Sequence, residues 1–564
     1  MPIHLISLVI FLFLATNNSL VFSAESKDFI YPKDKPSVFK KSILKTKNIK
    51  KDILPLTKPV IQKKLPEIKA APILKADEKQ KTINIKNQTF LIPKKKPKSY
   101  KTITKLKDTS KILNKKDFQN AKEVIKFVKA RKWNSALKAT EKVKDSDFKN
   151  LIKWMYLKTT GNSATFNDYQ KFLERNKNYP RIGRIQYLAE HKIYLKNNSP
   201  TAIINWFNKN PPVSGMGKIK LAEAYLEQGK QELVNDLIKE GWINAEIRKN
   251  DLGYYRAKFK KYLTIEDHIK RADYLSWETK YWDLKRMLRY LPKDERALYN
   301  ARQILMSNSY GVDKAISNVP THLKNNVGLQ YDRLKWRNRR GRLEQSLEIL
   351  YENGNKSEDD LVRADLWWSQ RESIVRTLIY KKRYKTAYKV STEHSLSSGP
   401  EFAEAEWLSG WVALTFLNSA EYALNHFDNF YNNVGYPISL ARGAYWLGKS
   451  YQKLGDKKNA NKYFQEGSVF LTTYYGQLSF NEINYGGEFT LKDETFFDKE
   501  YEKEFNKNVL IKHIKLLTEL DATKYGKDIF KHLAQLNIDK GSEVLAAKLA
   551  TESERYDYAI QISK

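Results

Sequence analysis

A basic and aromatic cluster at residues 331–342 has the strongest chemical pattern in this sequence. It reads YDRLKWRNRRGR, and the side chains expected to bind a ligand are Arg333, Trp336, Arg337, Arg339 and Arg340. An aromatic face can stack on a sugar ring, and the fork of an arginine binds a carboxylate through two hydrogen bonds. The alternative is structural: Leu334 and Trp336 pack in a core while the arginines line a hydrated helix face. The sequence leaves both interpretations open.

Patterns for other kinds of chemistry are missing from the sequence. It contains neither a GxGxxG nor a GxxxxGK[ST] phosphate loop, and no GxSxG nucleophile turn. The eight histidines never form HxxxH or HExxH, and there is no cysteine, which excludes disulfides and thiolate metal sites. We therefore expect no catalytic residue, no cofactor-binding residue and no metal ligand among these 564 residues.

The elements that would position the cluster are amphipathic helices. From about residue 117 onward, apolar residues recur at i, i+3, i+4 and i+7 between short breaks of Gly, Asn, Asp and Pro. The spacing of Leu447, Gly448, Tyr451, Ala460 and Phe464 is that of a tetratricopeptide repeat. In such a pair Gly448 lets one helix approach its partner closely, while Ala460 and Phe464 form a small and a large residue on the facing helix.

A related unit runs from Trp407 through Gly410 to Phe427. Helix pairs of this kind cannot bury their apolar faces alone, so they stack on one another. The predicted fold class is all-α: a superhelical solenoid of antiparallel helix hairpins, tetratricopeptide-like, with a ring or horseshoe shape.

The N-terminal region has a different texture. Residues 1–23 have the outline of a signal peptide, with an apolar run at 5–15 followed by VFSA, and this run is shorter than the roughly 20 residues that span a bilayer. Residues 24–116 are rich in lysine and proline and contain no glycine or tryptophan, which predicts a basic disordered linker. Export to the periplasm is therefore expected.

The positive charge is concentrated in this linker. Residues 25–116 hold 27 Lys against 8 acidic residues, a net charge of +19 out of +37 for the whole chain. An exported protein meets few nucleic acids but does meet acidic wall polymer and anionic membrane surfaces. We expect no nucleic-acid partner and at most peripheral membrane contact.

Signature blocks at residues 365–480 add a resemblance to a known family. The blocks DLWWSQRESIV, AYKVSTEHSLSSGPEFAEAEWLSGWVAL, ALNHF, PISLARGAYWLGKSYQKLG and TTYYGQLSF occur in that order. In type and order they resemble the soluble lytic murein transglycosylases. Upstream, from about 117 to 364, the similarity rests on helical texture.

The resemblance implies a fold and an activity. Members of this family have a superhelical domain closed into a ring, expected here at 117–472, and a helical linker domain, expected at 473–564. A C-terminal lysozyme-like domain follows and cleaves the glycosidic bonds of murein with a glutamic acid in an ESxF block. The Glu-Ser pairs of this sequence begin at Glu25, Glu372 and Glu552, and none has Phe two residues on. The resemblance therefore assigns no catalytic residue, and the catalytic domain is expected outside this chain.

The expected function follows from the resemblance. The chain is interpreted as the periplasmic, peptidoglycan-engaging scaffold of a lytic transglycosylase, with glycan strands as its partner and a separately encoded catalytic domain as a possible second one. The alternative is a tetratricopeptide-like adaptor that binds a protein of the cell envelope. Whether these residues alone have transglycosylase activity stays open.

Overall fold

The structure, a computed structural model, describes residues 82–85, 88–91, 109–307, 310–484, 487, 499–535 and 540–562. The expected signal peptide, 1–23, lies outside the described residues, as does most of the expected linker. Within the linker the structure places an antiparallel hairpin of β1 (Thr82–Ile85) and β2 (Gln88–Leu91), with Ile83 opposite Phe90. This part of the segment has regular structure that the linker interpretation did not include.

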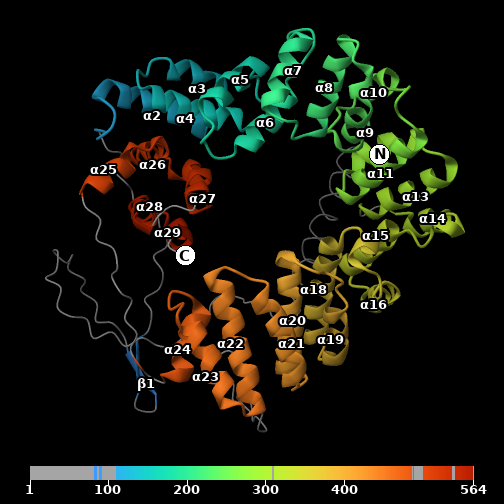
Figure 1. Cartoon of the computed structure of the whole chain (residues 1–564), viewed down its shortest axis with the longest axis vertical. Helices are drawn as coiled ribbons and strands as arrows, with labels where there is room; N and C mark the ends of the chain where they lie inside the picture. The colour runs from blue at the N-terminus through green and yellow to red at the C-terminus, as the bar shows by residue number, and fades with distance from the viewer. Residues whose placement is uncertain are drawn as a thin grey trace, which may run out of the picture. The chain divides into compact units, whose positions relative to one another are not determined.

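The helices of the first half form successive hairpins along the chain (Figure 1). Several begin at side-chain caps: Asn114 accepts a hydrogen bond from Asp117 N at 2.9 Å, and Thr165 and Asp168 form a capping box. The bounds are α2 Lys115–Lys129, α3 Trp133–Thr140, α4 Ser146–Leu157, α5 Phe166–Arg175, α6 Ile182–Glu190, α7 Pro200–Lys209, α8 Gly215–Glu227, η1 Gln231–Leu233, α9 Asn235–Asn244, α10 Leu252–Lys258, α11 Ile265–Trp277, α12 Tyr281–Met287, η2 Leu288–Tyr290, α13 Lys293–Leu305, α14 Val312–Ser317 and η3 Thr321–Leu323.

The second half continues in the same way. Its elements are α15 Val327–Arg339, α16 Leu343–Glu352, α17 Glu358–Leu361, α18 Ala364–Tyr380, α19 Tyr384–Thr392, α20 Gly399–Phe416, α21 Ala420–Asn432, α22 Pro437–Leu454, α23 Lys457–Ser468, α24 Tyr474–Ile483, α25 Lys499–Lys507, α26 Val509–Glu519, η4 Thr523–Gly526, α27 Lys527–Gln535, α28 Lys540–Glu552 and α29 Tyr556–Ile562. Residues 109–562, where described, contain only helices and connections, so the predicted all-α stack of hairpins is confirmed.

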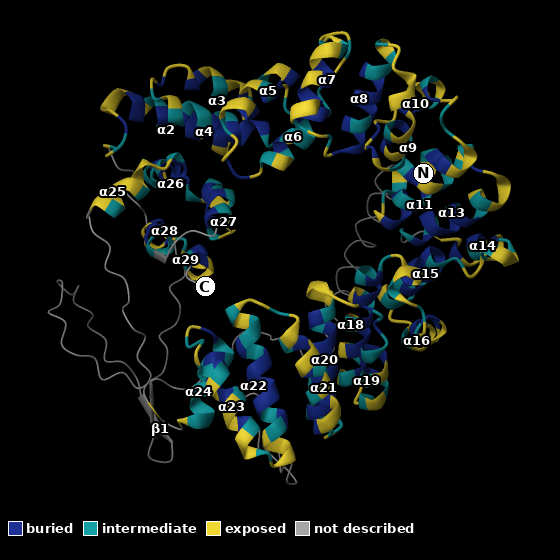
Figure 2. Cartoon of the chain, viewed as in Figure 1, coloured by how far each residue is buried: buried dark blue, intermediate teal, exposed yellow. Residues whose placement is uncertain are grey.

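The hairpins bury their apolar faces against one another. Figure 2 shows the buried residues where neighbouring helices meet and the exposed residues on the opposite sides. Three cores follow one another: one around α2–α8, a second from α8 to α15, and a third from α15 to α24. Because α24 packs on α22 and α23 in the third core, it continues the hairpin stack; the boundary expected at 472/473 stays a prediction. No helix in the described part of the chain is long and apolar enough to cross a membrane.

The tetratricopeptide spacing is confirmed in atomic detail. Gly448 on α22 faces Phe464 on α23 so closely that a Cβ at this position would lie 2.5 Å from Phe464 Cε1. Gly410 on α20 has the same relation to Phe427 on α21, at 2.8 Å. Both distances are below the van der Waals limit, so each glycine is required for its helix pair to pack.

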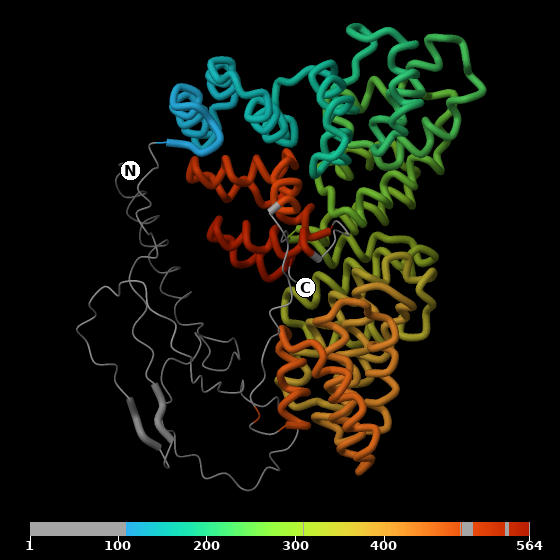
Figure 3. The backbone as a smooth tube through the Cα atoms, turned by 60° about the vertical axis from the view of Figure 1, so that its left-hand side comes forward, coloured from blue at the N-terminus to red at the C-terminus, as the bar shows by residue number. Residues whose placement is uncertain are grey.

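The last helices return to the first ones. The core of α2–α8 includes residues of α26–α29, among them Leu517 and Phe530, and Figure 3 shows this C-terminal segment beside the N-terminal helices. At the centre of this contact the buried His513 forms a hydrogen bond of 2.7 Å with the hydroxyl of Tyr179. We call these contacts the closure interface.

Ion pairs surround the closure interface. Lys512 Nζ lies 2.8 Å from a carboxylate oxygen of Asp145 and 2.6 Å from one of Asp147. At the C-terminal end of α4, Lys158 Nζ lies 2.7 Å from Asp528 of α27, and both side chains are about four-fifths buried. These pairs fix the orientation of the C-terminal helices more than they add to stability, because desolvation offsets much of their attraction.

Replacing Gly448 by alanine should destabilise the α22–α23 hairpin. The new methyl group overlaps Phe464, and such overpacking costs about 1–3 kcal/mol. The measurement is thermal unfolding followed by circular dichroism. Gly253→Ala on α10 is the matched control, since its Cβ meets nothing within 4 Å and should leave the unfolding temperature unchanged or slightly higher. Equal effects of both substitutions would contradict the close-packing argument.

The closure interface should weaken in mild acid. Burial lowers the pKa of His513 to about 4, against about 6.5 in the unfolded chain. The neutral ring therefore stabilises the fold fully above pH 6.5, and this contribution, at most about 3 kcal/mol, is lost as the pH falls towards 4.

The measurement is the midpoint of urea unfolding between pH 7 and pH 4.5. His513→Gln should lower the midpoint at pH 7 and flatten its pH dependence, whereas His322→Gln, at a side chain 66% exposed, should change neither. An unchanged slope in His513→Gln would contradict the assignment.

Candidate functional site

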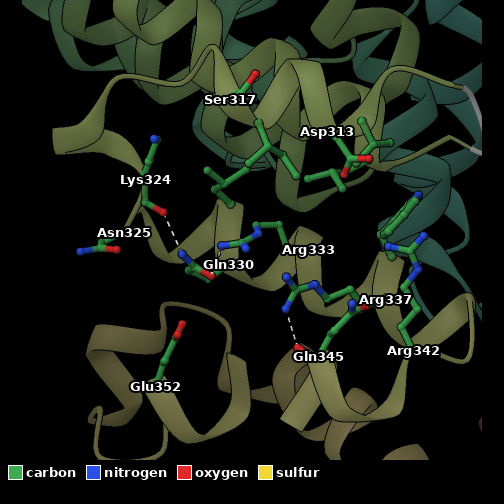
Figure 4. Close-up of a pocket in the computed structure, with 15 residues that line it drawn as sticks. Asp313, Ser317, Lys324, Asn325, Gln330, Arg333, Arg337, Arg342, Gln345 and Glu352 are labelled. Atoms are coloured by element: carbon green, nitrogen blue, oxygen red, sulfur yellow. Dashed lines mark hydrogen bonds between the residues drawn. The ribbon is translucent and has the colours of Figure 1, made fainter. Parts of the chain in front are cut away.

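A cavity of about 560 Å³ lies between α14, α15 and α16, at the cluster that the sequence singled out (Figure 4). Three of the five expected binding residues line it: Arg333, Trp336 and Arg337. They share one face of α15 because they are three and four residues apart, which is the spacing of neighbours on a helix. Asn326 begins this helix by accepting a hydrogen bond from Leu329 N at 3.0 Å.

Amide and backbone groups hold the arginines in place. Arg333 Nη1 donates to Gln330 Oε1 at 3.0 Å, and Gln330 Nε2 donates in turn to the carbonyl oxygen of Lys324 at 2.8 Å. Arg337 Nη1 donates to the carbonyl oxygen of Gln345 at the start of α16. Figure 4 shows both guanidinium groups between α14 and α16. The arginines are thus half-buried and oriented, which differs from the hydrated helix face of the structural alternative.

The charge of the cavity is predominantly positive. Four of its lining side chains are cations and two, Asp313 and Glu352, are acids. Burial and the nearby charge of Arg333 lower the pKa of Arg337. Arg337 has an acid 3.5 Å away, Glu348, but this carboxylate is 63% exposed and screened by water. The cavity therefore favours an anion.

Trp336 supports the structural alternative in part. Its side chain is only 9% exposed and belongs to the second core, as the packing interpretation expected. The guanidinium group of Arg342 lies 4.8 Å from the ring centroid, and that of Arg340 lies 5.5 Å away. The ring therefore has no open face on which a sugar could stack. Its indole nitrogen, however, is buried and has no hydrogen-bond partner among the described residues.

Arg339 and Arg340 do not line the cavity. Arg339 donates to the carbonyl oxygens of Leu305 and Ser307, at 3.2 and 3.0 Å, and so caps the C-terminal end of α13. The structure adds residues that the sequence did not single out: Lys324, Gln330, Gln345, Asp313 and Glu352. Gln330 lies on α15 itself and the other four come from neighbouring elements, and no pattern in the sequence shows which helix packs against α15.

A second polar cluster is buried among the signature blocks, around Glu406 on α20. Its carboxylate accepts hydrogen bonds from His394 Nε2 at 3.0 Å, His426 Nδ1 at 2.8 Å and Asn429 Nδ2 at 3.2 Å. Leu396 N donates to His394 Nδ1 at 3.0 Å, which places the ring proton on Nε2. Burial alone would raise the pKa of Glu406, but the hydrogen bonds from the two histidines lower it to about 2. Glu406 is therefore an anion that joins α19, α20 and α21.

Other signature residues have packing roles as well. The guanidinium group of Arg442 lies 3.4 Å from the ring centroid of Trp407 and donates to Glu404 at 3.1 Å. Trp446 packs on Phe427, with the ring planes 23° apart. The described residues contain no group of three or more His, Asp or Glu side chains positioned to hold a metal ion.

Comparisons with known proteins place the fold. No family model matches the chain, and no curated protein matches it. Among solved structures it is similar to an inactive mutant of the lytic transglycosylase Slt from Pseudomonas aeruginosa, with 15% identity, a TM-score of 0.50, and coverage of 80% of this chain and 70% of that one.

The 70 kDa soluble lytic transglycosylase from Escherichia coli is also similar, with 11% identity, a TM-score of 0.45, and coverage of 79% of this chain and 70% of that one. A complex of the 70 kDa enzyme with bulgecin A gives the same values. At these identities the similarity concerns the fold, and the fold expected from the signature blocks is confirmed by the Pseudomonas aeruginosa structure.

Replacing Glu406 by glutamine should destabilise the fold by about 2 kcal/mol or more, because an amide cannot accept hydrogen bonds from all three buried donors. Since the folded pKa of Glu406 is depressed, the carboxylate stabilises the fold above pH 4.5, and this contribution is lost between pH 4.5 and about 2.

Urea unfolding at pH 7 measures the difference in stability between Glu406→Gln and the unchanged chain. Glu404→Gln is the control, since its part-exposed pair with Arg442 should be worth under about 1 kcal/mol; a larger loss there than at Glu406 would contradict the prediction.

Proposed function

We propose that this chain engages peptidoglycan outside the cytoplasm, as the helical scaffold of a lytic transglycosylase. The observation that carries the proposal is the similarity of its backbone to a lytic transglycosylase over 80% of its length. The ordered signature blocks between residues 365 and 480 support the same assignment. Cleavage of the glycosidic bond would fall to a lysozyme-like domain, since none of the Glu-Ser pairs in these residues begins an ESxF block.

The basic cavity gives the proposal a binding site. The stem peptides of wall polymer carry free carboxylates, and arginine forks match carboxylate geometry. Arg333 and Arg337 would bind them, with Trp336 in the wall of the cavity. A periplasmic location is supported by the apolar run at residues 5–15 followed by VFSA.

The test is retention of the full chain on purified sacculi. We expect retention at low ionic strength that falls as salt is added, because exposed charges more than about 10 Å apart are screened at 0.1 M. A synthetic peptide covering residues 25–108 is the control for the basic N-terminal segment. Absence of retention at low salt, or equal retention of the peptide and the full chain, would overturn a role for the helical part.

A second candidate is a tetratricopeptide-like adaptor that binds a protein of the cell envelope. The observation that favours it is the tetratricopeptide packing at Gly448 and Phe464, because stacked hairpins of this kind present surfaces to peptides. Affinity capture from envelope extracts that recovers one protein at stoichiometric amount, with no retention on sacculi, would support the adaptor instead.

A further inference from the structure

The cavity at α15 contains donors without acceptors. Arg333 Nε and Trp336 Nε1 are both buried, and neither has a hydrogen-bond partner among the residues that the structure describes. Both residues line the cavity. The described residues hold other unpaired buried N–H groups in their cores, such as Trp367 Nε1 and Trp446 Nε1, so these two donors point to a bound acceptor only because charged side chains line the same cavity. A carboxylate or a peptide carbonyl provides such an acceptor.

The charges of the cavity indicate an ionised acceptor. In the described part of the chain neither Arg333 nor Arg342 forms an ion pair, and the pair of Arg337 with Glu348 is solvent-exposed. Lys324, an exposed residue, also lines the cavity; its carbonyl oxygen faces Gln330 and its side chain extends away from it (Figure 4). The four cations outnumber the nearby acids Asp313, Glu348 and Glu352, so their charge has no full counterpart among the described residues. A carboxylate would supply it, with the planar geometry that arginine prefers.

The rest of the lining excludes a neutral saccharide as the best ligand. The wall beside the arginines is apolar and consists of Leu305, Val312, Ile316 and Leu329. Sugars are bound by stacking on exposed aromatic faces, and the one aromatic ring here, Trp336, is nine-tenths buried with Arg342 over it. Small apolar side chains of a peptide would fit this wall.

The two acids of the cavity complete the pattern. Asp313 on α14 and Glu352 on α16 are exposed at its rim, on either side of the arginines (Figure 4). They are suited to an ammonium group. The cavity thus offers sites for carboxylates, for a small apolar side chain and for a cation, and its volume of about 560 Å³ is in the range of small-ligand pockets.

We propose that this cavity binds the peptide part of the wall polymer, a short peptide with free carboxylates and an ammonium group, and not the glycan. The proposal rests on the proposed function and names the substrate class of the same site. Arg333 and Arg337 would bind the carboxylates, the apolar wall would hold a small side chain such as alanine, and Asp313 would bind the ammonium group. Glycan strands would then be held through the peptides attached to them.

The experiment is calorimetric titration of the full chain with three probes. They are the peptide L-alanyl-γ-D-glutamyl-L-lysine, the same peptide with both carboxyl groups amidated, and chitotetraose. We expect the first to bind, the amidated peptide to bind at least 10-fold more weakly, and chitotetraose not to bind. Binding of chitotetraose, or equal binding of the two peptides, would overturn the proposal.

Variants locate the binding site. Arg333→Gln should lower the affinity for the peptide with free carboxylates about 10-fold. Arg376→Gln removes the same charge from an exposed position on α18 and should leave this affinity unchanged. Asp313→Asn changes an exposed side chain, so it carries little risk to folding. It should weaken binding of the peptide but leave unchanged the binding of a peptide acetylated at both amines. Unchanged binding in both Arg333→Gln and Asp313→Asn would overturn the assignment to this cavity.

A parallel measurement separates this proposal from the function on which it rests. Intact sacculi should retain the full chain, whereas glycan strands that an amidase has freed of their peptides, immobilised on beads, should not. Equal retention on both would overturn peptide binding and leave the proposed function intact. Retention on neither would overturn the proposed function. If an α-linked peptide of L-residues ending in glutamate binds as well as the wall peptide, the cavity is a general site for protein tails, and the proposal fails.

Discussion

The constraint on which the whole structure depends is that a helix hairpin cannot bury its apolar face alone. Each pair in this chain is covered by the next, and the three cores run in sequence from α2 to α24. Close contacts such as that of Gly448 with Phe464 bring the two helices of a pair near enough to bury their facing apolar side chains. A stack of this kind leaves an open face at its first hairpin, and here α26–α29 cover it with residues such as Leu517 and Phe530. The last helices therefore stabilise the first ones.

The same constraint positions the cavity. Helix α15 is held from behind by a buried ion pair, in which Arg302 of α13 bonds to Asp332 at 2.7 Å and to Asp273 at 2.6 Å. Gly328 on α15 leaves room for that guanidinium group, because a Cβ there would lie 2.4 Å from it. With Asp332 turned towards α13, the adjacent Arg333 lines the cavity. The packing of α13 on α15 thus determines which arginines are available to a ligand.

Local patterns predicted the fold well, and they grouped three of the residues that line one cavity. The offsets of Leu447, Gly448, Ala460 and Phe464 report contacts within one hairpin, and such contacts are encoded by neighbours in sequence. Helical spacing also grouped Arg333, Trp336 and Arg337 correctly. It could not show that Arg339 turns to α13, since that depends on which carbonyls lie nearby.

Contacts between residues far apart in sequence could not be predicted from the sequence. His513 and Tyr179 lie 334 residues apart, and their contact has no local signature. The same reason hides Asp313 and Glu352, which reach the cavity from other helices. The signature residue Glu406 shows a further limit: a matched block can mark a buried structural network as readily as a binding site.

Unpartnered arginine nitrogens are not in themselves a sign of a ligand site in this protein. Arg271 and Arg371 also have buried nitrogens without partners, yet both are at most 2% exposed, and their remaining nitrogens bond to carbonyl oxygens at the ends of neighbouring helices. Neither residue lines the cavity. Burial lowers the pKa of each to about 10, because a core disfavours the charged form of the guanidinium group. Both arginines therefore serve the packing of helices and do not mark a ligand site. Arg333 differs because its guanidinium group borders the cavity that Arg337, Arg342 and Lys324 also line. A ligand can reach it there, and an anion bound to it would remove the repulsion among these charges that the fold itself leaves in place.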